Sequence, residues 1–180
     1  MSRQDVLQRQ KSSPIQECSL FCRIFFKKRG GILSVIQTNR ALSRVEQLAA
    51  QCEIKGELDQ DGRQYVICFG LPEGRTQEVY VSDSTSDAGL PVVSLFSTCL
   101  VVDKGLFKGI SKPMALELLL MNESLNFARY GVQEDEESYI IVASCDLLLD
   151  SLNPEGLEAA LECVALAADG YEAKFGQDIH

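Results

Sequence analysis

The sequence lacks the groups from which most enzymatic sites are built. Its one histidine, His180, is the last residue, and no CxxC, GxxxxGK[ST], GxGxxG, GxSxG or HExxH pattern occurs. A zinc site needs four thiolate or imidazole ligands, and a cysteine nucleophile needs a base beside it. The missing motifs also argue against a phosphate-binding loop, a serine hydrolase and a zinc peptidase. We therefore expect no enzymatic activity, no metal and no other cofactor.

Long apolar runs are missing too, which argues against a transmembrane helix. The most apolar stretch near the N-terminus, residues 18–26, is about nine residues long and is interrupted by Arg23, whereas a spanning helix needs about 20 residues. A signal peptide carries its charges before the apolar stretch, but here residues 27–29 place them after it. We therefore expect a cytoplasmic protein.

Basic residues are scarce beyond the first part of the chain. Residues 1–31 hold seven of the 17 Lys and Arg residues and two of the 26 Asp and Glu residues, a net charge of +5. Since the whole chain carries −9, residues 32–180 carry −14. Such an acidic body repels phosphates, so we expect no nucleic-acid partner. Gly30 and Gly31 predict a hinge between a basic N-terminal arm, residues 1–31, and a single folded domain, residues 32–180.

The N-terminal arm leaves two interpretations open. Residues 18–29 are cationic and rich in phenylalanine, and they contain Cys18 and Cys22, which could carry acyl chains. Such a segment could contact an anionic membrane, and this is the one place where we expect such contact. The other interpretation is a flexible arm, or a gene start assigned too far upstream.

Seven cysteines are present, an odd number with wide spacing. Disulfide frameworks favour even counts in short secreted chains, so we expect free thiols in a reducing compartment. The seven are Cys18, Cys22, Cys52, Cys68, Cys99, Cys145 and Cys163.

Apolar periodicity predicts an α+β domain. Helical spacing and strand alternation follow one another in the order α-β-β-β-β-α-β-β-α, which predicts an antiparallel sheet with helices on one side. The expected helices are residues 34–52, 113–124 and 153–176, and the expected strands are residues 54–58, 63–70, 77–82, 91–102, 126–132 and 138–144. In the last helix, one stripe of apolar residues at spacings of three and four predicts a face packed on the core.

Four consecutive carboxylates, residues 134–137, stand between the last two expected strands. They could form a cation site or the tip of a hairpin. Clustered carboxylates repel one another, and this repulsion costs little free energy only where water solvates the charges. No further oxygen ligands for a cation follow at regular spacing. We therefore expect a solvated hairpin tip.

The helix at residues 113–124 is apolar around most of its circumference. A helix of this kind needs cover on two sides, one from its own sheet and one from something else. We expect a second copy of the chain to supply the second cover, with Met114, Leu118 and Met121 lining the contact. The alternative is that all three belong to the core of one chain.

The last third of the sequence resembles the YbjN-like family. The residues that carry the resemblance are "FARYG" at 127–131, the acidic turn, the apolar strand after it and the helix start "NPE" at 153–155. That family is related to the type III secretion chaperones. The resemblance, over roughly residues 34–175, implies a secretion chaperone-like fold and a non-enzymatic, homodimeric, bacterial protein-binding module.

The expected function is therefore binding of another polypeptide by a homodimer of the regulator-like or chaperone-like kind. Two alternatives remain. One is a dedicated chaperone for a type III secretion effector, which effector genes beside its own gene would favour. The other is a membrane-peripheral adaptor that is held through residues 18–29.

Overall fold

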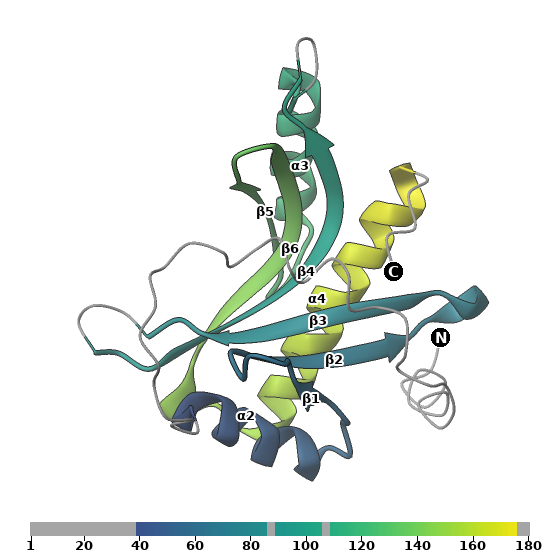
Figure 1. The fold of residues 1–180 in the computed structure, drawn as a ribbon. Coiled ribbons are helices and arrows are strands. Elements are labelled where there is room, and N and C mark those ends of the chain that lie inside the picture. The colour runs from purple at the N-terminus through teal and green to yellow at the C-terminus, as the bar shows by residue number, and fades with distance from the viewer. Residues whose placement is uncertain (1–38, 86–88, 106–108, 176–180) are drawn as a thin grey trace.

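The computed structural model describes residues 39–85, 89–105 and 109–175, which form an α+β domain (Figure 1). The predicted order of helices and strands and the antiparallel sheet are confirmed. The elements are α2 (Arg40–Gln51), β1 (Glu57–Leu58), β2 (Gln64–Gly70), β3 (Thr76–Asp83), β4 (Val92–Asp103), α3 (Lys112–Glu123), β5 (Arg129–Glu134), β6 (Ser138–Leu148), α4 (Pro154–Phe175) and the short 3-10 helices η2 (Pro72–Gly74) and η3 (Leu149–Ser151).

Several predictions fall outside the described residues. They are the nature of the arm, the membrane interpretation of residues 18–29, the thiols of Cys18 and Cys22, and the first residues of the helix expected at 34–52. Within the described part, α2 begins at Arg40, because the Asn39 side chain accepts hydrogen bonds from two backbone N–H groups of the first turn, at 2.9 and 3.3 Å.

The six strands are ordered β1-β2-β3-β4-β6-β5, and every neighbouring pair is antiparallel. The chain leaves β4, forms α3, and returns as a β5–β6 hairpin that places β6 between β4 and β5. As a result β5 is an edge strand beside α3. Figure 1 shows α3 and α4 behind the strands, with α2 at the lower end.

One hydrophobic core joins the three helices to one face of the sheet. The predicted apolar stripe of α4 is confirmed, and α4 packs on β3, β4 and β6. The buried members of the stripe are Leu157, Leu161, Val164, Ala168 and Tyr171. Because strand side chains alternate between faces, the other residues of these strands point away from the described helices.

Both strands of the hairpin differ from their predicted limits. Its first strand begins at Arg129 rather than at residue 126, because Phe127 has a left-handed backbone (φ 62°) that interrupts an extended chain. Its second strand continues to Leu148 rather than ending at residue 144, because β4 pairs with it over that whole length.

The acidic stretch forms the tip of this hairpin, as predicted. The Asp135 carboxylate accepts hydrogen bonds from the backbone N–H groups of Glu137 and Ser138, at 2.8 and 2.6 Å, and these bonds lower the pKa of Asp135. Lys104 forms an ion pair with Glu134 and lies over the ring of Tyr139. Within the described ranges, no group of three or more histidine, cysteine or acidic residues could hold a metal ion.

Two tyrosines in the core differ in how their hydroxyl groups are satisfied. The Tyr130 hydroxyl donates a hydrogen bond to the carbonyl of Ala167 in α4, at 2.7 Å. The Tyr171 hydroxyl is buried and has no hydrogen-bond partner among the described residues. Burial raises the pKa of each to about 12 from 10.0, because the phenolate would lose its hydration.

We expect the two phenylalanine substitutions to separate these roles. At pH 7, Tyr130→Phe should lower the free energy of unfolding by about 1 kcal/mol, because one buried hydrogen bond is lost, whereas Tyr171→Phe should change it little. Because the pKa of Tyr171 is raised in the folded state, its contribution to stability is complete below pH 10 and is lost as the pH rises toward 12. The free energy of unfolding of Tyr171→Phe should therefore fall less steeply above pH 10 than that of the original protein. Urea unfolding from pH 7 to 11 tests both, and an equal loss for both variants at pH 7 would contradict the assignment.

Candidate protein-binding surface

The inner side of α3 is anchored to the core by the residues predicted for a dimer contact. Leu118 is buried, and Met114 and Met121 are partly buried and pack against the core. Ser111 caps the helix by accepting a hydrogen bond from the Met114 N–H, at 3.3 Å. The structure brings the three predicted residues together on one side of α3, which faces their own chain. A contact of these residues with a second chain stays a prediction.

The outer side of α3 carries leucines that the core does not cover. Leu116, Leu119 and Leu120 are 55%, 68% and 62% exposed. Their spacing of three and four residues places them on one face of the helix. Next to them in the fold lie Phe127, which is 55% exposed between α3 and β5, and Val132 of β5, which is 46% exposed. We call these five residues the α3/β5 patch.

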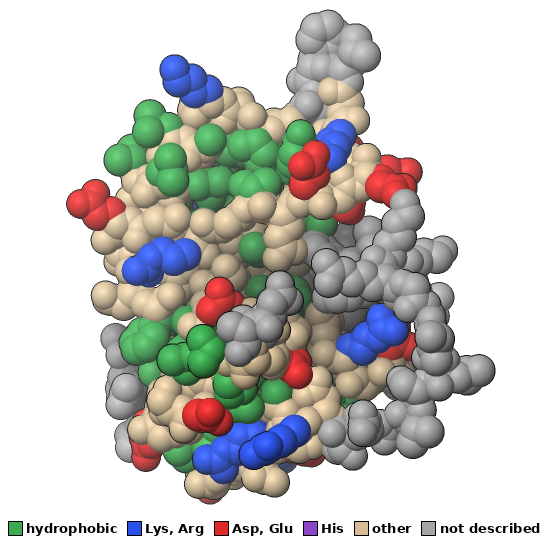
Figure 2. Space-filling view, turned by 90° about the vertical axis from the view of Figure 1, so that its left-hand side faces the viewer, with side chains coloured by type: hydrophobic (Ala, Val, Ile, Leu, Met, Phe, Trp, Pro, Cys, Tyr) green, Lys and Arg blue, Asp and Glu red, His purple; other side chains and the backbone are tan. Residues whose placement is uncertain are grey.

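Figure 2 shows hydrophobic side chains gathered in the upper part of this side of the molecule, where Figure 1 places α3 and β5. Single exposed leucines are ordinary on a protein surface, but a contiguous group of large apolar side chains marks an interaction site. At one side the helix is fixed to α4 by an ion pair between Glu117 and Lys174. The three leucines of the patch therefore lie on a helix that is packed on the core through Leu118 and linked to α4.

One edge of β5, the strand beside the patch, has no neighbouring strand. A side chain of α3 hydrogen-bonds to part of that edge. The Asn122 side chain accepts a hydrogen bond from the Tyr130 N–H at 2.6 Å and donates one to the Tyr130 carbonyl at 3.1 Å. Those backbone groups of Tyr130 therefore point away from β6. Because backbone direction repeats every two residues, the N–H and carbonyl of Val132 also point outward. The edge thus offers backbone groups to a strand from another chain, next to an apolar surface.

The described cysteines are unsuited to nucleophilic chemistry. Burial raises the pKa of all five thiols, and neighbouring acidic side chains raise most of them further. A raised pKa keeps a thiol protonated at neutral pH, and the thiolate is the reactive form. The five are Cys52, Cys68, Cys99, Cys145 and Cys163.

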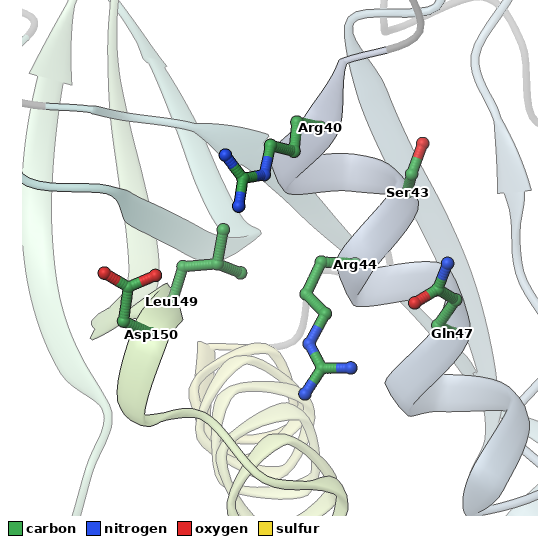
Figure 3. Close-up of a pocket in the computed structure, with 6 residues that line it drawn as sticks. All are labelled: Arg40, Ser43, Arg44, Gln47, Leu149 and Asp150. Atoms are coloured by element: carbon green, nitrogen blue, oxygen red, sulfur yellow. The ribbon is translucent and has the colours of Figure 1, made fainter.

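An open polar hollow of about 340 Å³ lies between α2 and η3 (Figure 3). Arg40 and Arg44 extend their guanidinium groups from α2 on either side of Leu149, and Asp150 extends its carboxylate from η3. Ser43 and Gln47 complete the lining. The hollow could hold an acidic side chain of a partner.

The outer leucines of α3 were not singled out by sequence reasoning, although their signal was present. The helix formed by residues 114–121 is apolar on two sides. The sequence therefore indicates that two faces need cover, but it does not distinguish the face that packs on the core. That choice depends on the approach of α4 and β5, which lie far away in the sequence.

No helix in the described part of the chain is long and apolar enough to cross a membrane.

Comparison with known proteins gives a structural similarity alone. No family model matches the chain, and no curated protein matches it. Among solved structures, a chain of "Structure of the HopA1-SchA Chaperone-Effector Complex" is similar with a TM-score of 0.48 and 12% sequence identity, over 73% of this chain and 92% of that chain. A similarity at this level carries no argument about function. The resemblance to the YbjN-like family therefore stays a prediction.

Proposed function

We propose that this protein is a non-enzymatic protein-binding module of the regulator-like or chaperone-like kind, and that it acts as a homodimer. The α3/β5 patch carries the proposal, because its five large apolar side chains are 46–68% exposed beside an open strand edge. Each apolar side chain that a partner buries contributes about 1.5–3 kcal/mol. Two copies related by a two-fold axis could cover the patch with the same patch.

The polypeptide that the dimer binds would contact the free backbone groups of an edge strand and the apolar side chains beside that strand. An extended segment gains affinity from backbone hydrogen bonds to an edge strand, and selectivity from apolar side chains beside it. The raised pKa values of the described thiols support a binding role over a catalytic one.

Sedimentation equilibrium of the full chain from 1 to 100 μM tests the dimer, and native mass spectrometry with a permanently unfolded test polypeptide tests the binding. We expect a dimer at micromolar concentration that takes up one polypeptide with defined stoichiometry. A monomer throughout this range would overturn the dimer. A dimer that binds no unfolded polypeptide would overturn the chaperone-like role and leave the dimer standing.

A further inference from the structure

The face of the sheet that points away from the described helices is also apolar. Register pairs place Val66, Tyr80, Phe96, Ile140 and Val142 on this face, which we call the open face. Tyr80 and Phe96 stack with ring centroids 5.4 Å apart. Tyr80, Ile140 and Val142 are buried, yet they do not belong to the hydrophobic core that includes the helices.

The charged residues of the open face are mainly acidic. Glu78 of β3 is only 8% exposed and accepts a hydrogen bond from the Tyr80 hydroxyl. Register places Glu57 and Asp146 on the same face, against one basic residue at a paired position, Arg129. A carboxylate among apolar side chains is costly without a nearby cation. The face therefore suits an occupant that combines apolar bulk with positive charge.

The chain itself contains such a segment within reach. Residues 18–29, "CSLFCRIFFKKR", combine large apolar side chains with four basic residues and no acidic one. The described domain starts at Asn39, whose side chain hydrogen-bonds with Asp83 at the end of β3. In the order of the six strands, β3 is the third. The connecting residues 30–38 can span roughly 30 Å when extended, and six paired strands are roughly 24 Å wide. Every strand of the open face is therefore accessible to the segment.

We propose that residues 18–29 of the same chain dock on the open face of the sheet, with their apolar side chains on Tyr80, Phe96, Ile140 and Val142 and their basic residues near Glu78. This goes beyond the proposed function and does not depend on the α3/β5 patch. In this arrangement the arm occupies one apolar surface of the domain, so a partner that needs the open face must displace the arm.

Photo-cross-linking in the full chain tests the proposal. We would place p-benzoylphenylalanine at position 96 (Phe96→p-benzoylphenylalanine) and, in a second protein, at position 66, and map the linked peptides by mass spectrometry. Position 166 on the outer side of α4 serves as the control site. Mixing isotopically light and heavy chains distinguishes a link within one chain from a link between two.

We expect links from positions 96 and 66 to residues 18–29 of the same chain, and few from position 166. Phe21→Ser/Phe25→Ser/Phe26→Ser should reduce their yield at least five-fold, whereas the matched control Val6→Ser/Leu7→Ser/Ile15→Ser should not. Lys27→Glu/Lys28→Glu/Arg29→Glu should also reduce it, whereas Arg3→Glu/Arg9→Glu/Lys11→Glu should not.

Links to residues 18–29 of another chain would overturn the proposal in favour of an exchange of arms between copies. Equal links from all three positions, or none to residues 18–29, would also overturn it. In the last case, flotation of the chain with vesicles of phosphatidylcholine and phosphatidylserine would assign the segment to a membrane surface instead.

Discussion

Leu119→Asp should convert the proposed dimer to a monomer at micromolar concentration, with a dissociation constant at least 100-fold higher. Leu119 is the most exposed large apolar residue of the described chain, at 68%, so its substitution leaves the core of the monomer intact. In a two-fold dimer the side chain is buried twice, and each copy loses about 1.5–3 kcal/mol of apolar burial. The new carboxylate would in addition lose its hydration at the interface. Sedimentation equilibrium at several concentrations measures the change.

The matched control for this prediction is Leu166→Asp. Leu166 is 52% exposed on the outer side of α4, away from the α3/β5 patch, and the substitution changes the charge by the same amount. It should leave the dissociation constant within about three-fold of the original value, because surface changes away from an interface alter free energies by about 0.5 kcal/mol or less. Equal weakening by both variants would show that net charge, and not the patch, controls association.

The edge of β5 can be tested separately from the leucines. Val132→Pro removes an N–H that points away from β6, so the pairing between β5 and β6 keeps its hydrogen bonds, and proline is tolerated at such positions of edge strands. If a bound polypeptide pairs with this edge, the variant should bind the unfolded test polypeptide less tightly by about 1 kcal/mol, close to five-fold. Unchanged polypeptide binding would place the polypeptide elsewhere.

The order of helices and strands could be predicted because each element has its own local signal. The apolar stripe runs along α4, a helix of 22 residues, and the turn at Gly62 and the helix caps at Ser111 and Asn153 form between residues that are close in the sequence. The predicted limits of a strand were wrong where a single residue takes an unusual backbone conformation. Phe127 reads as part of a strand, but its left-handed backbone delays β5 until Arg129.

The candidate site could be predicted only to the level of the element. The sequence indicates that the helix now seen as α3 needs cover on two sides, and the structure assigns Leu118 to the core and Leu119 to the surface. Neighbouring residues on a nearly uniform apolar helix have no distinguishing local signal. Their difference arises from where β5 and α4 approach the helix, and no local pattern contains that information.

Gly56 lies where the chain enters β1 and passes very close to β2. A Cβ atom at this position would lie 2.6 Å from the carbonyl oxygen of Val66 and 2.7 Å from the ring of Tyr65. Tyr65 is a core residue with 3% exposure, and the Val66 carbonyl is part of the sheet backbone, so neither can easily move away. Glycine is therefore required here by the space between two backbones, and not by its backbone angles.

Gly56→Ala should accordingly lower the free energy of unfolding by about 2–3 kcal/mol, the usual cost of overpacking a rigid site. Gly170→Ala is the matched control: nothing lies within 4 Å of its Cβ position, and Gly170 is inside α4. The same added methyl group should there raise the free energy of unfolding by about 0.5–1 kcal/mol, because alanine favours the helix. Urea unfolding of both variants at one protein concentration measures the difference. A loss below 0.5 kcal/mol for Gly56→Ala would mean that β1 moves away from β2 at little cost, and that the short strand contributes little to the sheet.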